Sequence, residues 1–149
     1  MSRDGTILLV EDNADDEALS LRAFARNNIR NPIKCVRDGQ EALDWLFGEG
    51  QYEGRNPDAR PSVVLLDLKL PKVDGIEVLR RIRSHPATSL TPVVILTSSR
   101  EDQDRLAGYA LGANSFIRKP VDFTEFVEAV RQLGLYWLVL NEPPPPPKG

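Results

Sequence analysis

The chain has 149 residues and a formal net charge of −3 at pH 7, which fits a single domain and argues against a protein that binds nucleic acid through a basic surface. Its single cysteine, Cys35, excludes an internal disulfide, and one histidine, His85, is too few for a Cys/His metal cluster. Because the chain has no run of ~18 apolar residues and no signal-peptide pattern, we expect a cytoplasmic protein without a membrane span.

In the first half of the chain, short apolar runs alternate with helical patterns. The apolar run at 6–10 predicts a buried strand, and a helix is expected over 15–27 with an asparagine N-cap before it. A second strand is predicted at 33–36, and Asp38 with a glutamate three residues later marks the start of another helix. Glycines and prolines over 48–61 predict a long surface loop.

The same alternation continues in the second half. The β-branched run at 63–66 predicts a strand, and a helix is expected to open at 74–75. A strand at 93–96 precedes a helix expected over 101–111, which the following glycine would close.

The last elements are a short strand at 115–118 and a helix that Asp122 caps, which runs through Leu133 to an aromatic ending at 135–138. Five strand–helix units with strands that are apolar on both faces predict an α/β domain: a doubly wound, five-stranded parallel sheet with helices on both faces. We expect one domain over 1–140 and a proline-rich, disordered tail over 141–149.

Polar side chains follow four of the predicted strands directly. They are Glu11 and Asp12, Asp67, Thr97, and Lys119. The carboxyl ends of parallel strands meet at one edge of the sheet, where such folds place their sites. Three carboxylates brought together repel one another unless a cation compensates, and oxygen ligands of this kind suit Mg²⁺. With a lysine and a hydroxyl to contact the phosphoryl oxygens and a carboxylate to accept the group, the set matches phosphoryl transfer.

Taken one at a time, these residues have ordinary structural explanations. An acid after a strand is commonly a helix N-cap, a lone Lys-Pro is commonly a turn, and a threonine at a strand end commonly reflects β propensity. Their joint placement after four different strands is what favours a site.

The chain resembles the receiver domain of bacterial two-component response regulators over residues 5–135, which has a flavodoxin-like fold. The motifs that carry this resemblance are Val10-Glu-Asp-Asn13, Asp38-Gly-Gln-Glu-Ala42, Leu66-Asp-Leu-Lys-Leu-Pro71 with Asp74-Gly75, Leu96-Thr-Ser98, Gly112-Ala-Asn114 and Lys119-Pro120.

The resemblance implies a role for each of these site residues. Asp67 would accept the phosphoryl group from a sensor histidine kinase. Mg²⁺ would be bound by Asp12 and Asp67, by Glu11 beside them, and by the backbone carbonyl of Lys69. Thr97 and Lys119 would contact the phosphoryl group, and Phe116 falls where the family has an aromatic switch residue.

Within the family, the chain looks most like single-domain regulators that partner bacterial phytochrome kinases. The loop 48–61, the segment 112–122 and the aromatic ending Leu135-Tyr-Trp-Leu138 carry this narrower resemblance. It implies a role in light signalling. The segment 133–140 is apolar in almost every direction, which predicts a homodimer through the last helix. The alternative is that this segment folds back on its own domain.

Three other functions compete with the phosphoacceptor. Phosphatases of the haloacid dehalogenase type carry a second aspartate two residues after the nucleophile, where this chain has Lys69. A nucleotide-binding protein needs a glycine-rich loop after its first strand, and this chain has acids there. A pseudo-receiver, which would bind partners without phosphorylation, would lack one of the acids or the lysine, and none is missing.

His85, Cys35 and Trp45 are not expected to take part in chemistry. His85 is predicted to be a solvent-exposed loop residue, Cys35 a small strand residue and Trp45 a packing residue.

Overall fold

The structure is a computed structural model that describes residues 5–56, 59–97, 110, 112–113, 115–118 and 123–133. Except for residue 110, the helix expected over 101–111 lies outside the described residues, as do the proline-rich tail and the apolar segment after Leu133.

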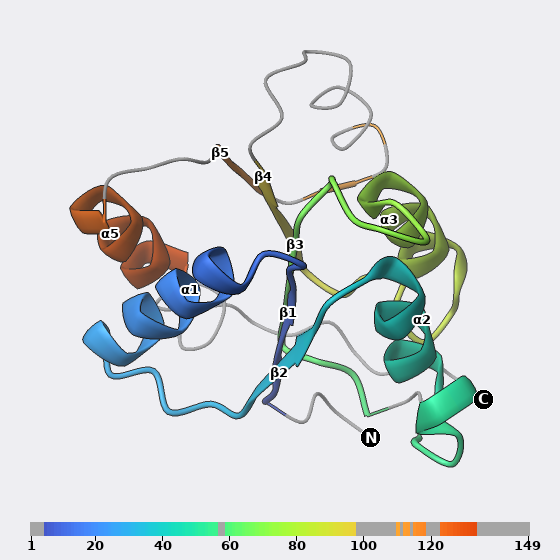
Figure 1. The fold of residues 1–149 in the computed structure, drawn as a ribbon. Coiled ribbons are helices and arrows are strands. Elements are labelled where there is room, and N and C mark those ends of the chain that lie inside the picture. Colours follow the sequence, from blue (N-terminus) through green and yellow to red (C-terminus); the bar gives the residue numbers. More distant parts are fainter. Residues whose placement is uncertain are drawn as a thin grey trace.

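The centre of the fold is a parallel sheet of five strands in the order β2-β1-β3-β4-β5 (Figure 1). The strands are β1 Ile7–Val10, β2 Ile33–Val36, β3 Val63–Leu66, β4 Val93–Thr97 and β5 Ser115–Arg118. After β1 the chain first moves outward to β2 and then crosses to β3 on the other side of β1. The ends of β1 and β3 therefore flank the point where the winding reverses, which is where open parallel sheets place their sites.

Helices cover both faces of the sheet. Figure 1 shows α1 (Ala14–Arg26) and α5 (Phe123–Leu133) on one face and α2 (Gly39–Phe47) and α3 (Gly75–Ser84) on the other. This arrangement confirms the predicted α/β fold with a parallel sheet and helices on both sides.

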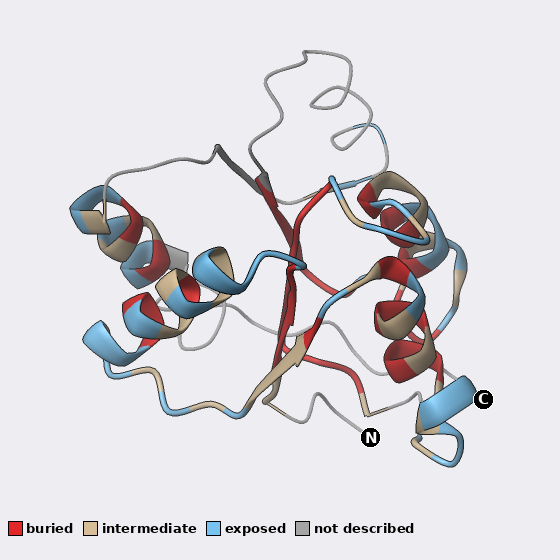
Figure 2. Cartoon of the chain, viewed as in Figure 1, coloured by how far each residue is buried: buried red, intermediate tan, exposed pale blue. Residues whose placement is uncertain are grey.

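Alternating strand residues feed two separate cores, one on each face. Leu8 and Val10 of β1 pack with the residues under α2 and α3, whereas Ile7 and Leu9 pack with those under α1 and α5. Successive side chains of a strand point to opposite faces, so a strand buried on both sides must be apolar throughout. Figure 2 shows this burial along the central strands, and it explains the continuous apolar runs in the sequence.

Each of three helices begins at a side-chain cap. The Oδ1 atoms of Asn13, Asp38 and Asp74 accept hydrogen bonds from the backbone N–H groups of the residues three positions later, at 3.0, 2.7 and 3.1 Å. These bonds satisfy amides that have no partner within the helix. The predicted start of α2 at Asp38 is confirmed, and α1 begins at Ala14, one residue before the predicted start.

The prediction of a surface loop over 48–61 is only partly right. The segment contains a short 3₁₀ helix, Gly50–Tyr52, and the side chain of Arg60 is buried. The Cζ of Arg55 lies over the buried ring of Trp45, 3.5 Å from the ring centroid, and the Nη1 of Arg55 donates to the Trp45 carbonyl at 2.9 Å. Cation–π stacking and backbone carbonyls thus bind the loop to α2, which glycine and proline content does not reveal.

His85 also differs from its prediction, since it is half-buried rather than solvent-exposed. Its ring stacks on Phe47 with centroids 4.5 Å apart, and its Nδ1 accepts a hydrogen bond from the Ala87 N–H at 3.0 Å. An amphipathic ring at the end of α3 can bury one face on an aromatic neighbour.

Among the described residues, no helix has the length and apolar character needed to cross a membrane.

Candidate functional site

The acids that follow β1 and β3 are brought together by the pairing of these strands. The Asp67 N–H donates to the Val10 carbonyl at 3.1 Å, and the Glu11 N–H donates to the Val36 carbonyl at 3.0 Å, so the ladder continues one residue past each strand. As a result, Glu11, Asp12 and Asp67 each offer a carboxylate oxygen, and these oxygens all lie within 4.8 Å of one another. The sequence-based expectation of three neighbouring carboxylates agrees with this geometry.

Two of the three carboxyl groups are removed from solvent. Glu11 is 1% exposed and Asp67 is 5% exposed, whereas Asp12 is exposed. Two like charges about 4 Å apart repel by ~1 kcal/mol in water and by ~4 kcal/mol near a protein surface. A cluster of this kind is stabilised by a bound cation. Three carboxylates form a hard oxygen donor set, which fits a divalent ion such as Mg²⁺.

Backbone amides orient two of these carboxylates. The Lys69 N–H donates to Asp67 Oδ1 at 2.9 Å, and the Asn13 N–H donates to Glu11 Oε2 at 3.3 Å. Each bond forms within a tight local turn directly after a strand, so the direction of each side chain is set by the chain immediately following it. Asp67 is held at the base of the loop between β3 and α3.

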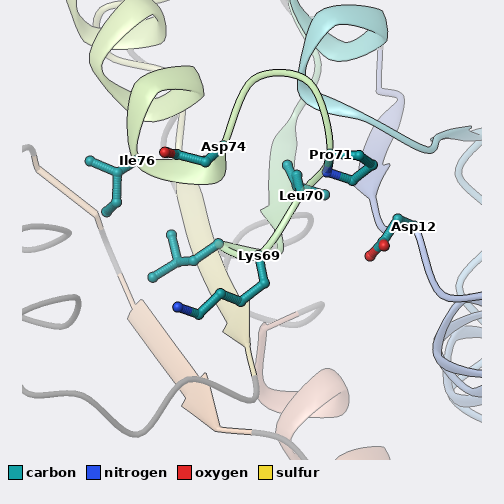
Figure 3. A pocket seen from close by; sticks show the side chains of 7 residues that line it. Asp12, Lys69, Leu70, Pro71, Asp74 and Ile76 are labelled. Atoms are coloured by element: carbon teal, nitrogen blue, oxygen red, sulfur yellow. The ribbon is translucent and has the colours of Figure 1, made fainter.

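An open cavity of about 390 Å³ lies beside the acids (Figure 3). Its wall combines the apolar side chains of the β3–α3 loop with two carboxylates and one lysine. The lining residues are Asp12, Leu68, Lys69, Leu70, Pro71, Asp74 and Ile76. The cavity therefore gives a group from solvent room to reach Asp12 and the β3–α3 loop. The apolar wall and Asp74 were not among the residues predicted for the site, although several of them belong to the motif Leu66–Pro71 with Asp74-Gly75 that carries the family resemblance.

Gly75, the first residue of α3, closes this loop. Its N–H donates to the Leu68 carbonyl at 3.0 Å, and a Cβ atom at this position would lie 2.3 Å from the Asp67 carbonyl oxygen. That approach is shorter than any side chain permits, so only glycine allows the loop to fold back on the residue that carries the acid.

The remaining predicted site residues are placed only in part. Thr97 is the last residue of β4 and Phe116 lies in β5, while their side chains and all of Lys119 lie outside the described residues. β4 pairs with β3 through Leu66 and Ile95, so the backbone of Thr97 reaches the same edge of the sheet as Asp67.

Cys35 lies in β2, one of the two edge strands, and does not belong to the group formed by Glu11, Asp12 and Asp67. Burial, with a smaller contribution from the negative charge of Glu17, raises the pKa of its thiol. A raised pKa keeps the thiol protonated and makes it a poor nucleophile, as expected for a packing residue.

Comparison with known families shows which family the chain belongs to. Residues 7–131 match the response regulator receiver domain family. The chain belongs to this family. The acids at the ends of β1 and β3 therefore lie in a receiver domain.

Two curated relatives cover most of the chain. The probable methanogenesis regulatory protein FilR2 of Methanothrix harundinacea is 42% identical over 140 residues, which is 94% of this chain and 88% of that protein. Response regulator Rcp1 of Synechocystis sp. is 36% identical over 132 residues, or 89% of this chain and 88% of that protein. The chain is thus similar to these response regulators over nearly their full length.

Solved structures of response regulators superpose closely. The phosphorylated cyanobacterial phytochrome response regulator RcpA has a TM-score of 0.84 at 37% identity, and the Mn²⁺-bound form of Rcp1 has 0.83 at 35%; each match covers 95% of this chain and 99% of the other. The bacteriophytochrome response regulator RtBRR is 49% identical with a TM-score of 0.77, covering 97% of this chain and 86% of that one. A divalent ion is therefore present in a structure of one of these relatives, Rcp1.

Proposed function

We propose that this receiver domain is a single-domain response regulator in which Asp67 accepts a phosphoryl group from a histidine kinase. The observation that supports this most directly is the cluster of Glu11, Asp12 and Asp67, whose oxygens lie within 4.8 Å of one another beside an open cavity. Membership of the receiver family indicates the class of reaction, and the cluster indicates which residues would carry it out.

In the proposed transfer, an Asp67 carboxylate oxygen forms a bond to phosphorus while the bond from phosphorus to the kinase imidazole nitrogen breaks. Asp12, with Asp67, Glu11 and the Lys69 carbonyl, would hold Mg²⁺. When bound, the ion neutralises the charge that gathers on the acids and the phosphoryl oxygens. The amide of Lys69, which donates to Asp67 Oδ1 at 2.9 Å, keeps one carboxylate oxygen engaged, so the other oxygen is the expected nucleophile.

Phosphorylation would act as a switch rather than as a step in a turnover cycle. Thr97 would bond a phosphoryl oxygen and Lys119 would pair with its charge, and Phe116 would reorient with them. The switch is a shift between two populations, and its size is limited by the difference in contacts that the phosphoryl group makes in each.

The pathway proposed for this switch is light signalling with a phytochrome-type kinase as the partner. Its support is similarity to RcpA and RtBRR, which are described as phytochrome and bacteriophytochrome response regulators. We further propose that residues 1–140 form the receiver domain, that 141–149 form a disordered tail, and that neither nucleic acid nor a membrane is a partner.

The function is tested by incubating the protein with phosphoramidate and MgCl₂ and measuring its intact mass. We expect a mass increase of one phosphoryl group, and none when EDTA replaces the metal. A protein that acquires no phosphoryl group, or acquires it equally in EDTA, would refute the proposed function.

Thr97 and Lys119 are expected to matter more for the response than for the transfer, because neither donates nor receives the phosphoryl group. Thr97→Ala and Lys119→Ala should each retain some phosphorylation but lose most of the change in Trp fluorescence or NMR shifts that it causes. Either variant showing the full wild-type spectral change at equal phosphorylation would contradict these roles.

Self-association is proposed through the end of the last helix and the apolar residues that follow it. The segment 133–140 has more apolar residues than one packed face can cover. We expect wild type to sediment as a dimer at tens of micromolar, where an interface worth ~7 kcal/mol is populated. Tyr136→Ala/Trp137→Ala should sediment as a monomer. A wild type that stays monomeric would show that the segment covers its own domain instead.

A further inference from the structure

The β3–α3 loop contacts a second helix besides the one it leads into. Its tip, residues 71–73, lies against the first turn of α2, more than thirty positions earlier in the chain. The Gly39 N–H points at the Pro71 carbonyl at 3.4 Å, and a Cβ atom on Gly39 would lie 1.8 Å from the Val73 carbonyl oxygen. Any other residue at position 39 would push the loop away from α2.

The loop adopts a strained conformation at this contact. Lys72 has a φ of +68°, a backbone conformation that residues other than glycine rarely adopt. Its Nζ lies 3.6 Å from Asp38 Oδ2, but its side chain is 69% exposed, so this ion pair contributes little. The strained turn is therefore held mainly by the close approach of backbone to backbone at Gly39.

The first turn of α2 is a firm support for this contact. Asp38 caps the helix through the Glu41 N–H at 2.7 Å, and Glu41 Oε1 accepts from the Arg37 N–H at 3.0 Å. Ala42 and Leu43 are buried in the core one turn later. A helix start fixed by its cap and its core contacts cannot easily follow a displaced loop, so a larger residue at 39 would move the loop instead.

The displaced loop is the one that carries the site. Asp67 and the Lys69 carbonyl lie at its base, joined by the hydrogen bond from the Lys69 N–H to Asp67 Oδ1. Gly75 closes the loop at its other end through the Leu68 carbonyl. Only five residues lie between Leu68 and Asp74, and the tip that contacts Gly39 is among them. A shift of this tip is therefore transmitted to Lys69.

We propose that Gly39 is a positioning residue for the cation: by admitting the Val73 carbonyl against its Cα atom, it sets the loop that presents Asp67 and the Lys69 carbonyl. This inference rests on the proposed function, in which these groups hold the metal. Gly39 itself would touch neither the ion nor the phosphoryl group.

The test is a titration of the full chain with Mn²⁺, followed by electron paramagnetic resonance of the free ion. Gly39→Ala should raise the Mn²⁺ dissociation constant about tenfold, the size of effect seen when residues that orient metal ligands are changed. Circular dichroism should show the same helix content as wild type. Asp38→Ala, which removes the cap and loosens the same helix start, should raise the constant less, about threefold. If Gly39→Ala does not fold, the Mn²⁺ dissociation constant of Asp38→Ala tests the proposal in its place.

Phe47→Leu is the matched control, because Phe47 is a buried residue in the last turn of α2 whose ring stacks on His85 and not on the loop tip. It should lower the free energy of unfolding and leave the Mn²⁺ constant unchanged, which separates positioning from general stability. Wild-type affinity in folded Gly39→Ala, or in Asp38→Ala if the first variant does not fold, would overturn the proposal. A wild type that binds no Mn²⁺ would instead refute the metal site of the proposed function.

Discussion

Asp67→Asn is expected to abolish phosphorylation by phosphoramidate or by a kinase. An amide oxygen is a far weaker nucleophile than a carboxylate. Among the three clustered acids, Asp67 is the one joined by a hydrogen bond to the β3–α3 loop that lines the cavity, through the Lys69 N–H. The variant should fold, because Asn is nearly isosteric with Asp and the Lys69 N–H can still donate to the side-chain oxygen. The measurement is intact mass after incubation with the donor and MgCl₂.

Asp74→Asn is the matched control for this loss. Asp74 lines the cavity beside the clustered acids and is an aspartate like Asp67, and Asn replaces Asp well as the N-cap of α3. We expect this variant to be phosphorylated. If Asp67→Asn were labelled as fully as Asp74→Asn, Asp67 would not be the acceptor.

Asp12→Ala is expected to remove most of the stabilisation that Mg²⁺ gives to the fold. In wild type, the ion binds the folded state alone, and a concentration one hundred times the dissociation constant stabilises it by ~2.7 kcal/mol. For a domain of this size, that is a rise of several degrees in Tm, at about 2–4 °C per kcal/mol. Differential scanning calorimetry with and without millimolar MgCl₂ measures the rise.

Without the metal, Asp12→Ala should melt at or above the wild-type temperature, because one of three mutually repelling charges is gone. Asp15→Ala serves as the control, since Asp15 is also an exposed acid of this segment but is not one of the three clustered acids. It should keep the full response to Mg²⁺. A wild type whose Tm does not respond to millimolar Mg²⁺ would contradict the three-acid metal site.

The parts of the fold that follow from burial were predictable from the sequence. β1 and β3 are buried on both faces, so their runs are apolar without alternation, and the acids directly after them mark the edge of the sheet. The caps of α1 and α2 were also predictable, because Asn13 and Asp38 are residue types whose side chains reach the free amides at the start of a helix.

Contacts between segments distant in the chain were not predictable in this way. The stacking of Arg55 on Trp45 and of His85 on Phe47 depends on how the loops return to α2, and no local pattern encodes that path. The Asp-Gly pairs at the starts of α2 and α3 were visible as motifs. What a Cβ at Gly39 or Gly75 would strike became apparent only once the β3–α3 loop was placed against them.

The central claim, that Asp67 takes the phosphoryl group at a cluster of metal-binding acids, is tested most directly by mapping the modified residue. The protein is phosphorylated with phosphoramidate and MgCl₂, the acyl phosphate is reduced with borohydride, and the peptides are sequenced by mass spectrometry. Reduction should convert residue 67 to homoserine, in the Mg²⁺-treated sample and not in the EDTA-treated one. Homoserine at Asp12, at Asp74 or at no position would contradict the account.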